Sequence, residues 1–280
     1  MLGLGKTITK ESYVSPDAAK YSSKLYLEFD GVSEYGELLS SSGDKDTFMD
    51  AVSTTGGTMS FWVRSDDFYQ SNSGQQYYWM GQYYFSFPEV KSFYIGTRND
   101  AGTNRIIIYR ADLNISTSTF TRWADFKSVS ADDLTDDTWH HIAVIMKPFG
   151  SGWRTLLYVD GTQVSLTTFG GGVNASNTLN PSYLGMDMTI GRYNTQYGRV
   201  DLNEMAFWSS ELSSSEISYI YNQGLTGFDF TQNAGDYTSA SDLYSWHQMG
   251  DKDETESIEP DSSGNNRDMT LYNAPSRLEH

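Results

Sequence analysis

The chain has 280 residues, no cysteine and a formal net charge of −17. The missing cysteines exclude disulfides, thiol catalysis and cysteine-ligated metals, and the acidic charge argues against nucleic acid as a partner. No stretch approaches the roughly 20 apolar residues that a membrane span needs, so no membrane insertion is expected.

The first half of the chain predicts strands separated by polar loops. Residues 1–23 are small and polar, which indicates an irregular N-terminal arm. A strand is expected over 25–29, where apolar residues alternate, and another over 58–64. The segment 76–87 is rich in aromatic residues, and two further strands are predicted at 92–96 and 105–110.

The second half adds a hairpin and a short helix. Residues 139–146 form a predicted strand, and Asp160-Gly161 is the turn of a β-hairpin over 156–164. Strands are expected again at 189–191 and 203–208. Ser213 and Glu216 then form a capping box that predicts a short helix ending at Gly224. The pattern as a whole is that of an all-β chain.

Motifs in three parts of the chain carry a family resemblance. The central part reads Trp-His-His followed by apolar residues and Tyr-Val-Asp-Gly, and the closing part reads Ile-Gly-Arg and then Leu-Ser-Ser-Ser-Glu-Ile. The motifs lie at 27–31 with 59–63, at 137–144 with 157–161, and at 190–192 with 203–208 and 212–217. The chain thus resembles the laminin-G-like, concanavalin A-like lectin and glucanase domains. This resemblance implies a jelly-roll β-sandwich of two antiparallel sheets with one short helix.

The resemblance also suggests how the domain is bounded. A single jelly-roll domain is expected over 24–277. Residues 243–246 and the Asp-Ser-Ser-Gly-Asn segment within 260–271 look like the first strand and turn of the family, although here they come last. They indicate either permuted closing strands over 243–273 or the start of a second, truncated unit, and permutation is favoured. Residues 278–280 look like the remnant of an expression tag and are left out of the expected fold.

The aromatic segment is a candidate ligand-binding site. The residues proposed are Tyr77, Tyr78, Trp79, Gln82 and Tyr83. Flat rings can pack against sugar C–H faces while an amide hydrogen-bonds hydroxyl groups. The alternative is that alternate rings fill the core and the others cover a neighbouring subunit.

A structural Ca²⁺ is the cofactor that the resemblance implies. Its candidate ligands are Asp30, Asn203 and Glu204, at positions that match the family's cation site at the rim of the sandwich. Ca²⁺ prefers six to eight oxygen ligands from carboxylates, amides and carbonyls. The family commonly has Asp where this chain has Asn203, which weakens the site. The alternative is that Asp30 merely turns the chain and that Glu204 is solvated.

No catalytic residue is proposed. His140 and His141 are adjacent on a strand and face opposite ways, so one is expected to be buried and hydrogen-bonded and the other to lie at the surface. Asp201 and Glu204 are three residues apart, whereas glucanases of this superfamily use alternating acids on one strand. The candidate functions are a structural protein, a carbohydrate-binding module and a glycan-cleaving enzyme, and the last of these is therefore the least favoured.

The layout of the chain is similar to structural proteins of tailed bacteriophages. The expected function is a non-catalytic structural or decoration protein of the virion, with an adhesive role, and the alternative is a calcium-dependent, lectin-like carbohydrate-binding module. Expected partners are other virion proteins, a second copy of the chain and a host-surface glycan. Residues 1–6 do not resemble a signal peptide, so synthesis in the host cytoplasm and location in the virion are expected.

Overall fold

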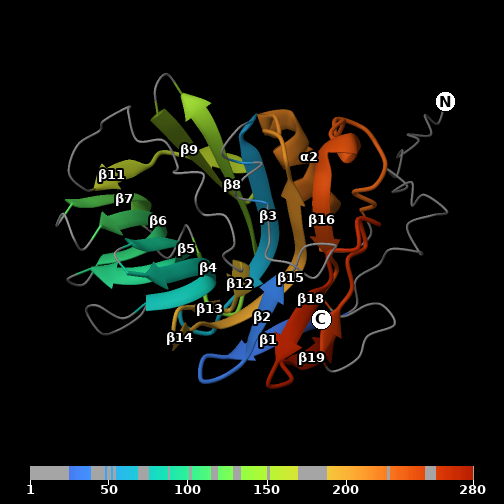
Figure 1. Cartoon of the computed structure of the whole chain (residues 1–280). Coiled ribbons are helices and arrows are strands. Elements are labelled where there is room, and N and C mark those ends of the chain that lie inside the picture. The colour runs from blue at the N-terminus through green and yellow to red at the C-terminus, as the bar shows by residue number, and fades with distance from the viewer. Residues whose placement is uncertain are drawn as a thin grey trace, which may run out of the picture.

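Two antiparallel β-sheets face each other across a hydrophobic core, and helix α2 covers the outside of one of them (Figure 1). The structure is a computed structural model, and it describes residues 25–38, 48, 52, 55–68, 76–87, 89–100, 103–114, 119–128, 134–149, 152–169, 188–225, 228–249 and 257–279. The arm expected over 1–23 lies outside these residues. The architecture confirms the predicted all-β jelly-roll β-sandwich.

The first sheet has eight strands, and β15 is its centre. Strand β1 pairs with the first half of β15, and β16 pairs with its second half. The order is β10 (Thr162–Val164), β9 (Gly152–Val159), β8 (His140–Phe149), β3 (Gly57–Arg64), β15 (Arg199–Trp208), β1 (Leu25–Asp30) and β19 (Ser276–Glu279), with β16 (Leu243–His247) also on β15.

The second sheet has nine strands, of which β4, β5 and β6 are long and lie side by side (Figure 1). The order is β11 (Thr167–Phe169), β7 (Thr119–Ser128), β6 (Thr103–Asn114), β5 (Glu89–Asp100), β4 (Gln76–Ser86), β12 (Met188–Ile190), β2 (Tyr35–Leu38), β18 (Met269–Tyr272) and β17 (Ile258–Glu259). A small separate hairpin, β13 (Arg192–Tyr193) with β14 (Gln196–Tyr197), follows β12.

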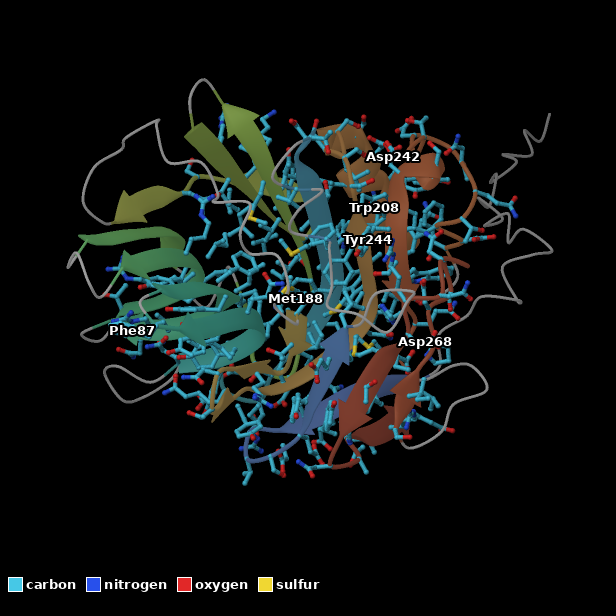
Figure 2. The ribbon with its side chains drawn as sticks, viewed as in Figure 1. Phe87, Met188, Trp208, Asp242, Tyr244 and Asp268 are labelled. Atoms are coloured by element: carbon cyan, nitrogen blue, oxygen red, sulfur yellow. The ribbon has the colours of Figure 1, made fainter. Side chains whose placement is uncertain are left out.

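Side chains alternate between the two faces of each strand, and those that point inward form the core between the sheets. Phe61 and Val63 of β3 face Phe93 and Ile95 of the other sheet within one cluster of buried apolar side chains. Met188 belongs to the same cluster, and Figure 2 shows it in the interior of the molecule. Each fully buried side chain of this size contributes about 2 kcal/mol relative to an exposed one.

A second apolar cluster lies on the outside of the eight-stranded sheet. Helix α2 (Ser214–Gln223) packs Ile217 and Ile220 there against Trp208 and Trp246 (Figure 2 labels Trp208). The 3-10 helix η3 (Ala240–Asp242) precedes β16. Because α2 covers this face, residues that a two-layer sandwich would expose are buried.

The predicted helix signals are confirmed. Ser213 and Glu216 form a reciprocal capping box, and the helix ends at Gly224, whose φ of 74° suits glycine. None of the helices among the described residues has the length and apolar character needed to cross a membrane.

The C-terminal residues supply strands to both sheets. β16 pairs with β15 in the first sheet, and β18 pairs with β2 in the second (Figure 1). The exclusion of 278–280 from the fold was wrong for two residues, because Leu278 pairs with Tyr26 and Glu279 with Leu25. These pairs close the edge of the sheet beside β1, whatever the origin of the residues. That residues 243–273 are permuted closing strands stays an interpretation.

Candidate binding face

The five residues predicted to bind ligand do not share one face of the sheet. Strand β4 carries a register shift between Tyr78 and Met80, and as a result Trp79 and Met80 both lie in the core. Gln82 is opposite Phe93 and is only 1 % exposed. Trp79 and Gln82 therefore cannot contact a ligand on the outside, and the prediction was wrong for both.

The other three residues have different surroundings. Tyr77 is half-buried, and its hydroxyl donates to Oδ2 of Asp67 at 3.3 Å. Tyr78 and Tyr83 lie on the outer face of the nine-stranded sheet, where Tyr78 is buried under other rings and Tyr83 is 38 % exposed. Only Tyr78 and Tyr83 thus belong to an outward aromatic surface.

That surface is much larger than the sequence indicated. It consists of tyrosines from five strands of the outer face and from the β13–β14 hairpin, and we call it the tyrosine face. Its members are Tyr35, Tyr78, Tyr83, Tyr94, Tyr109, Tyr193, Tyr197 and Tyr272. Six of them are half-buried or exposed, and Tyr78 and Tyr94 form the floor beneath.

The first group of rings lies over β4, β5 and β6. Tyr94 stacks on Tyr109 with centroids 4.9 Å apart, and Tyr78 stacks on Tyr193 at 5.1 Å. Tyr78 and Tyr94 meet edge to face at 5.1 Å, as do Tyr83 and Tyr193 at 5.8 Å. Such offset and edge contacts are the favoured geometries of aromatic pairs, so the rings hold one another in place.

The second group lies over β2 and β18. Tyr35 and Tyr272 are cross-strand partners, and their rings stack 4.4 Å apart with an angle of 5° between the planes. The Arg192 guanidinium lies 4.1 Å from the centre of the Tyr35 ring and 5.9 Å from that of Tyr197. A cation held over tyrosine in this way stabilises the stack by about 0.5–1 kcal/mol at an exposed site.

The β13–β14 hairpin separates the two groups. It can approach β4 because Gly81 has no side chain: a Cβ there would come 2.9 Å from the Cβ of Tyr193. The Tyr78 hydroxyl lies 2.6 Å from Oε1 of Gln196 and 3.0 Å from Oε1 of Gln76, and it donates to one of them at a time. Amide groups thus border the rings.

The hydroxyls of the floor are neutral donors. Burial raises the pKa of Tyr94 and Tyr78 well above the ordinary value, with Arg98 opposing part of the shift. Burial also raises the pKa of Tyr193 to about 12. The tyrosine face therefore offers flat apolar rings together with hydroxyl and amide groups at neutral pH.

The three predicted calcium ligands do not come together. Asp30 pairs with Arg199, which is four residues before Asn203 on β15 and so about 13 Å away along the strand. Oδ1 of Asp30 accepts hydrogen bonds from the backbone N–H groups of Val32 and Ser33 at 2.8 and 2.9 Å. The carboxylate turns the chain, as the alternative interpretation held.

Asn203 and Glu204 have structural roles inside a bulge of β15. Asn203 is fully buried, and its Oδ1 accepts the backbone N–H of Glu204. Glu204 has a φ of 45° and is 5 % exposed, so it is not solvated, and its Oε2 accepts the indole N–H of Trp246 at 2.7 Å. In the part of the chain that the structure describes, no three His, Asp or Glu side chains are placed to hold a metal ion. The predicted calcium site is therefore not formed by these residues.

Both adjacent histidines are buried, which corrects the expectation that one lies at the surface. His141 points outward, where Trp62 and Tyr221 cover it, and Nε2 lies 2.8 Å from the Ser60 hydroxyl. Burial lowers the pKa of His141 to about 4, against an opposing effect of Asp160. Ser60 is 2 % exposed and His141 1 %, so this Ser–His contact is shielded from substrate.

Sequence reasoning missed six of the eight tyrosines. Tyr94 and Tyr109 are cross-strand neighbours, but only the register of β5 and β6 shows this. Tyr193 and Tyr197 reach the face through a hairpin whose position over β4 no sequence pattern predicts. The signal that existed was the count of 20 tyrosines in the chain.

Comparison with known proteins agrees with the fold. A family model described as the concanavalin A-like lectin/glucanases superfamily matches residues 41–218. Among curated proteins, none matches the chain.

Solved structures are similar only distantly. The binding domain of botulinum neurotoxin serotype D is 12 % identical with a TM-score of 0.41, and the match covers 62 % of this chain and 38 % of that one. The enzymatically active domain of tailspike protein 2 from bacteriophage CBA120 is 11 % identical with a TM-score of 0.42, covering 79 % of this chain and 33 % of that one. The CBM40 of Ruminococcus gnavus IT-sialidase, bound to alpha2,3 sialyllactose, is 11 % identical with a TM-score of 0.40, covering 71 % and 99 %. The chain thus spans 38 % and 33 % of the length of the first two proteins.

Proposed function

The chain belongs to the concanavalin A-like lectin/glucanases superfamily, and from that premise we propose that it is a non-catalytic binding protein whose tyrosine face holds carbohydrate. The observation that carries the proposal is the set of tyrosines packed in two groups on the outer face of the nine-stranded sheet. Scattered surface rings are ordinary, but a contiguous group on one face is typical of a recognition surface.

Tyrosine suits this role for a physical reason. Its ring is flat and apolar, its hydroxyl is polar, and fixing it costs little conformational entropy because it has two side-chain torsions. Rings that already stack on one another, such as Tyr94 on Tyr109, lose still less freedom when a ligand binds. The amides of Gln76 and Gln196 lie beside them and suit the hydroxyl groups of a sugar.

Several acidic and basic side chains are buried or already paired within the protein, which supports a non-catalytic role. His140 and His141 are buried, Glu204 binds Trp246, and Asp201 pairs with Arg64 at 2.7 Å. Glycoside hydrolysis needs two carboxyl groups that flank one bond.

The test is a glycan array with the full chain, followed by calorimetry on the best binder. Tyr83→Ala and Tyr109→Ala are expected to weaken binding at least tenfold each, corresponding to about 1.4 kcal/mol. Phe87→Ala is the matched control, because Phe87 is an exposed aromatic residue (71 %) on the turn after β4 that is not a member of the tyrosine face. It should leave affinity unchanged.

Two results would contradict the proposal. Failure to bind any glycan would remove the function, and full affinity in both tyrosine variants would remove the site. Circular dichroism and the thermal midpoint of each variant must match the parent protein, so that lost binding is not lost folding.

The virion location, the virion partners and self-association stay predictions. The tyrosine face also fits a second copy of the chain, because six partly exposed rings could be covered by their own counterparts. Sedimentation equilibrium checks this: a dimer that Tyr83→Ala and Tyr109→Ala dissociate would favour the structural role over glycan binding.

A further inference from the structure

Arg192 holds a positive charge beside the second group of tyrosines. Its guanidinium lies 4.1 Å from the centre of the Tyr35 ring, and that ring stacks on Tyr272. Tyr35 is half-buried and Tyr272 is 37 % exposed, so both residues retain surface that solvent reaches on the outer face of the sheet. The cation and the stacked rings thus lie together at the surface of the tyrosine face.

Short contacts hold the Arg192 guanidinium in place. Nε donates to the backbone carbonyl of Asn194 at 2.5 Å, and the backbone carbonyl of Arg192 accepts the Thr189 hydroxyl at 2.7 Å. The Tyr35 ring covers one side of the planar group. A group that is already fixed loses little conformational freedom when it binds a partner, so this arrangement favours binding.

The other donors of Arg192 have no protein partner within the part of the chain that the structure describes. Neither Nη atom donates to a described residue, and neither is completely shielded from solvent. Glu37 shares the outer face of β2 with Tyr35, but no ion pair joins it to Arg192. The charge of Arg192 is thus held at the surface without an acid to neutralise it.

Other arginines in the described ranges do have acidic partners. Arg64 pairs with Asp201 at 2.7 Å, and Arg199 pairs with Asp66 at 2.5 Å. In a chain with 36 acidic and 19 basic residues, an arginine without an acid is the less expected arrangement. An anion from outside the protein is the partner that Arg192 lacks.

We propose that Arg192 binds the carboxylate of an acidic saccharide, while the rings of Tyr197 and Tyr272 contact its sugar residues. A guanidinium matches a carboxylate through two parallel hydrogen bonds, and because Nε already donates to Asn194, the two Nη atoms supply them. Tyr197 is half-buried and lies 5.9 Å from the cation, measured to the centre of its ring. This inference rests on the proposed carbohydrate-binding function and specifies its ligand class.

The experiment is calorimetry on the full chain with matched saccharides. The probes are oligosaccharides of galacturonate, of glucuronate and of mannuronate, and one that ends in sialic acid. Each is measured beside its own neutral form, in which the carboxylates have been reduced to alcohols. At least one acidic form should bind about tenfold or more tightly than its neutral form, because only the carboxylate accepts both hydrogen bonds from the guanidinium.

Arg192→Gln should weaken binding of that acidic form about tenfold or more and leave binding of its neutral form unchanged. Arg199→Gln is the matched control, because it removes the same charge from β15 of the other sheet, where Arg199 pairs with Asp66. The control should change neither affinity. The thermal midpoints of both variants check folding, and the comparison of acidic with neutral forms on the parent protein depends on neither variant.

The outcomes separate this inference from the function on which it rests. Equal binding of acidic and neutral forms, or full affinity of Arg192→Gln for the acidic form, would overturn the carboxylate site and leave carbohydrate binding in place. Binding of neutral glycans alone on the glycan array would do the same. If neither the probes nor any glycan on the array bound, the proposed function and this inference would both be overturned.

Discussion

The Nδ1 atom of His140 lies 2.8 Å from Oδ2 of Asp160, while Nε2 of the same ring accepts the backbone N–H of Thr135 at 2.8 Å. An accepting Nε2 places the ring proton on Nδ1, which then donates to Asp160. The other carboxylate oxygen of Asp160 accepts the N–H of His141 at 2.8 Å. One carboxylate thus joins the start of β8 to the β9–β10 turn.

Asp160→Asn should destabilise the protein by about 1–2 kcal/mol, because an amide NH₂ opposite the Nδ1–H of His140 places two donors together. Asparagine tolerates the positive φ of 49° at this position, so the substitution adds little backbone strain. Asp160→Ala should destabilise the protein by about 1 kcal/mol more than Asp160→Asn, because alanine accepts neither hydrogen bond and does not favour a positive φ. Urea unfolding measures both, and equal stability of the three proteins would show that the carboxylate has no such role.

Glu204→Ala should destabilise the protein by about 2–4 kcal/mol, because it leaves the buried indole N–H of Trp246 without the acceptor seen at 2.7 Å. Glu204→Gln keeps a carbonyl oxygen of the same reach and should cost less than half as much. Guanidinium unfolding followed by tryptophan fluorescence gives both values. If Gln were as damaging as Ala, the charge of Glu204 would matter and the hydrogen bond to Trp246 would not explain the position.

Glu216 connects helix α2 to the segment before β16. Oε2 accepts the backbone N–H of Ser213 at 2.8 Å, and Oε1 accepts the hydroxyl of Ser239 at 2.6 Å. Burial opposes ionisation of Glu216, but hydrogen bonds from Ser239, Ser213 and Thr238 outweigh it and hold its pKa below the ordinary value.

Ser213→Ala should cost about 1 kcal/mol, the usual value of an N-cap. Glu216→Ala should cost about 2–3 kcal/mol, because it also releases the 238–239 segment. Thermal unfolding ranks the two variants. The N-cap is a local interaction, whereas the contact of Glu216 with Ser239 joins segments far apart in the chain. If Glu216→Ala lowered the stability no more than Ser213→Ala, the contact with Ser239 would add nothing.

Acid should weaken the fold through His141. Its folded pKa of about 4 is below the ordinary value of about 6.5, so between these pH values the unfolded state binds more protons than the folded state. The stability contributed by the neutral ring is complete above pH 6.5 and falls as pH drops towards 4, by about 3 kcal/mol in total.

The His141→Gln variant isolates this effect. Asp201 acts in the opposite direction, because burial raises its folded pKa to about 6 against the pull of Arg64, and it is present in both proteins. Burial lowers the pKa of His247 as well, and that residue also cancels in the comparison. The difference in unfolding free energy between parent and variant should shrink by about 3 kcal/mol from pH 7 to pH 4. A constant difference would mean that His141 does not titrate with folding.

Local chemistry explains what could be predicted from the sequence. The Asp160-Gly161 turn and the Ser213–Glu216 capping box are encoded within a few residues, and both form as expected. Strand β7 was missed because Thr119–Ser128 mixes charged and apolar residues without a clear period of two. The strands expected at 92–96 and 105–110 extend over 12 residues each, because pairing with long neighbours continues through polar positions.

The sequence by itself determined the all-β class, the superfamily, the hairpin and the helix, since each depends on periodicity or on contacts between near neighbours. Only the tertiary structure decided which aromatic residues face outward. A register shift near Trp79 moved it into the core, and strand pairing and a hairpin assembled tyrosines from six parts of the chain. The tertiary structure likewise separated Asp30 from Asn203 and buried both histidines under α2 or loops. The reason is that strand register and layer packing are set by contacts between residues far apart in sequence.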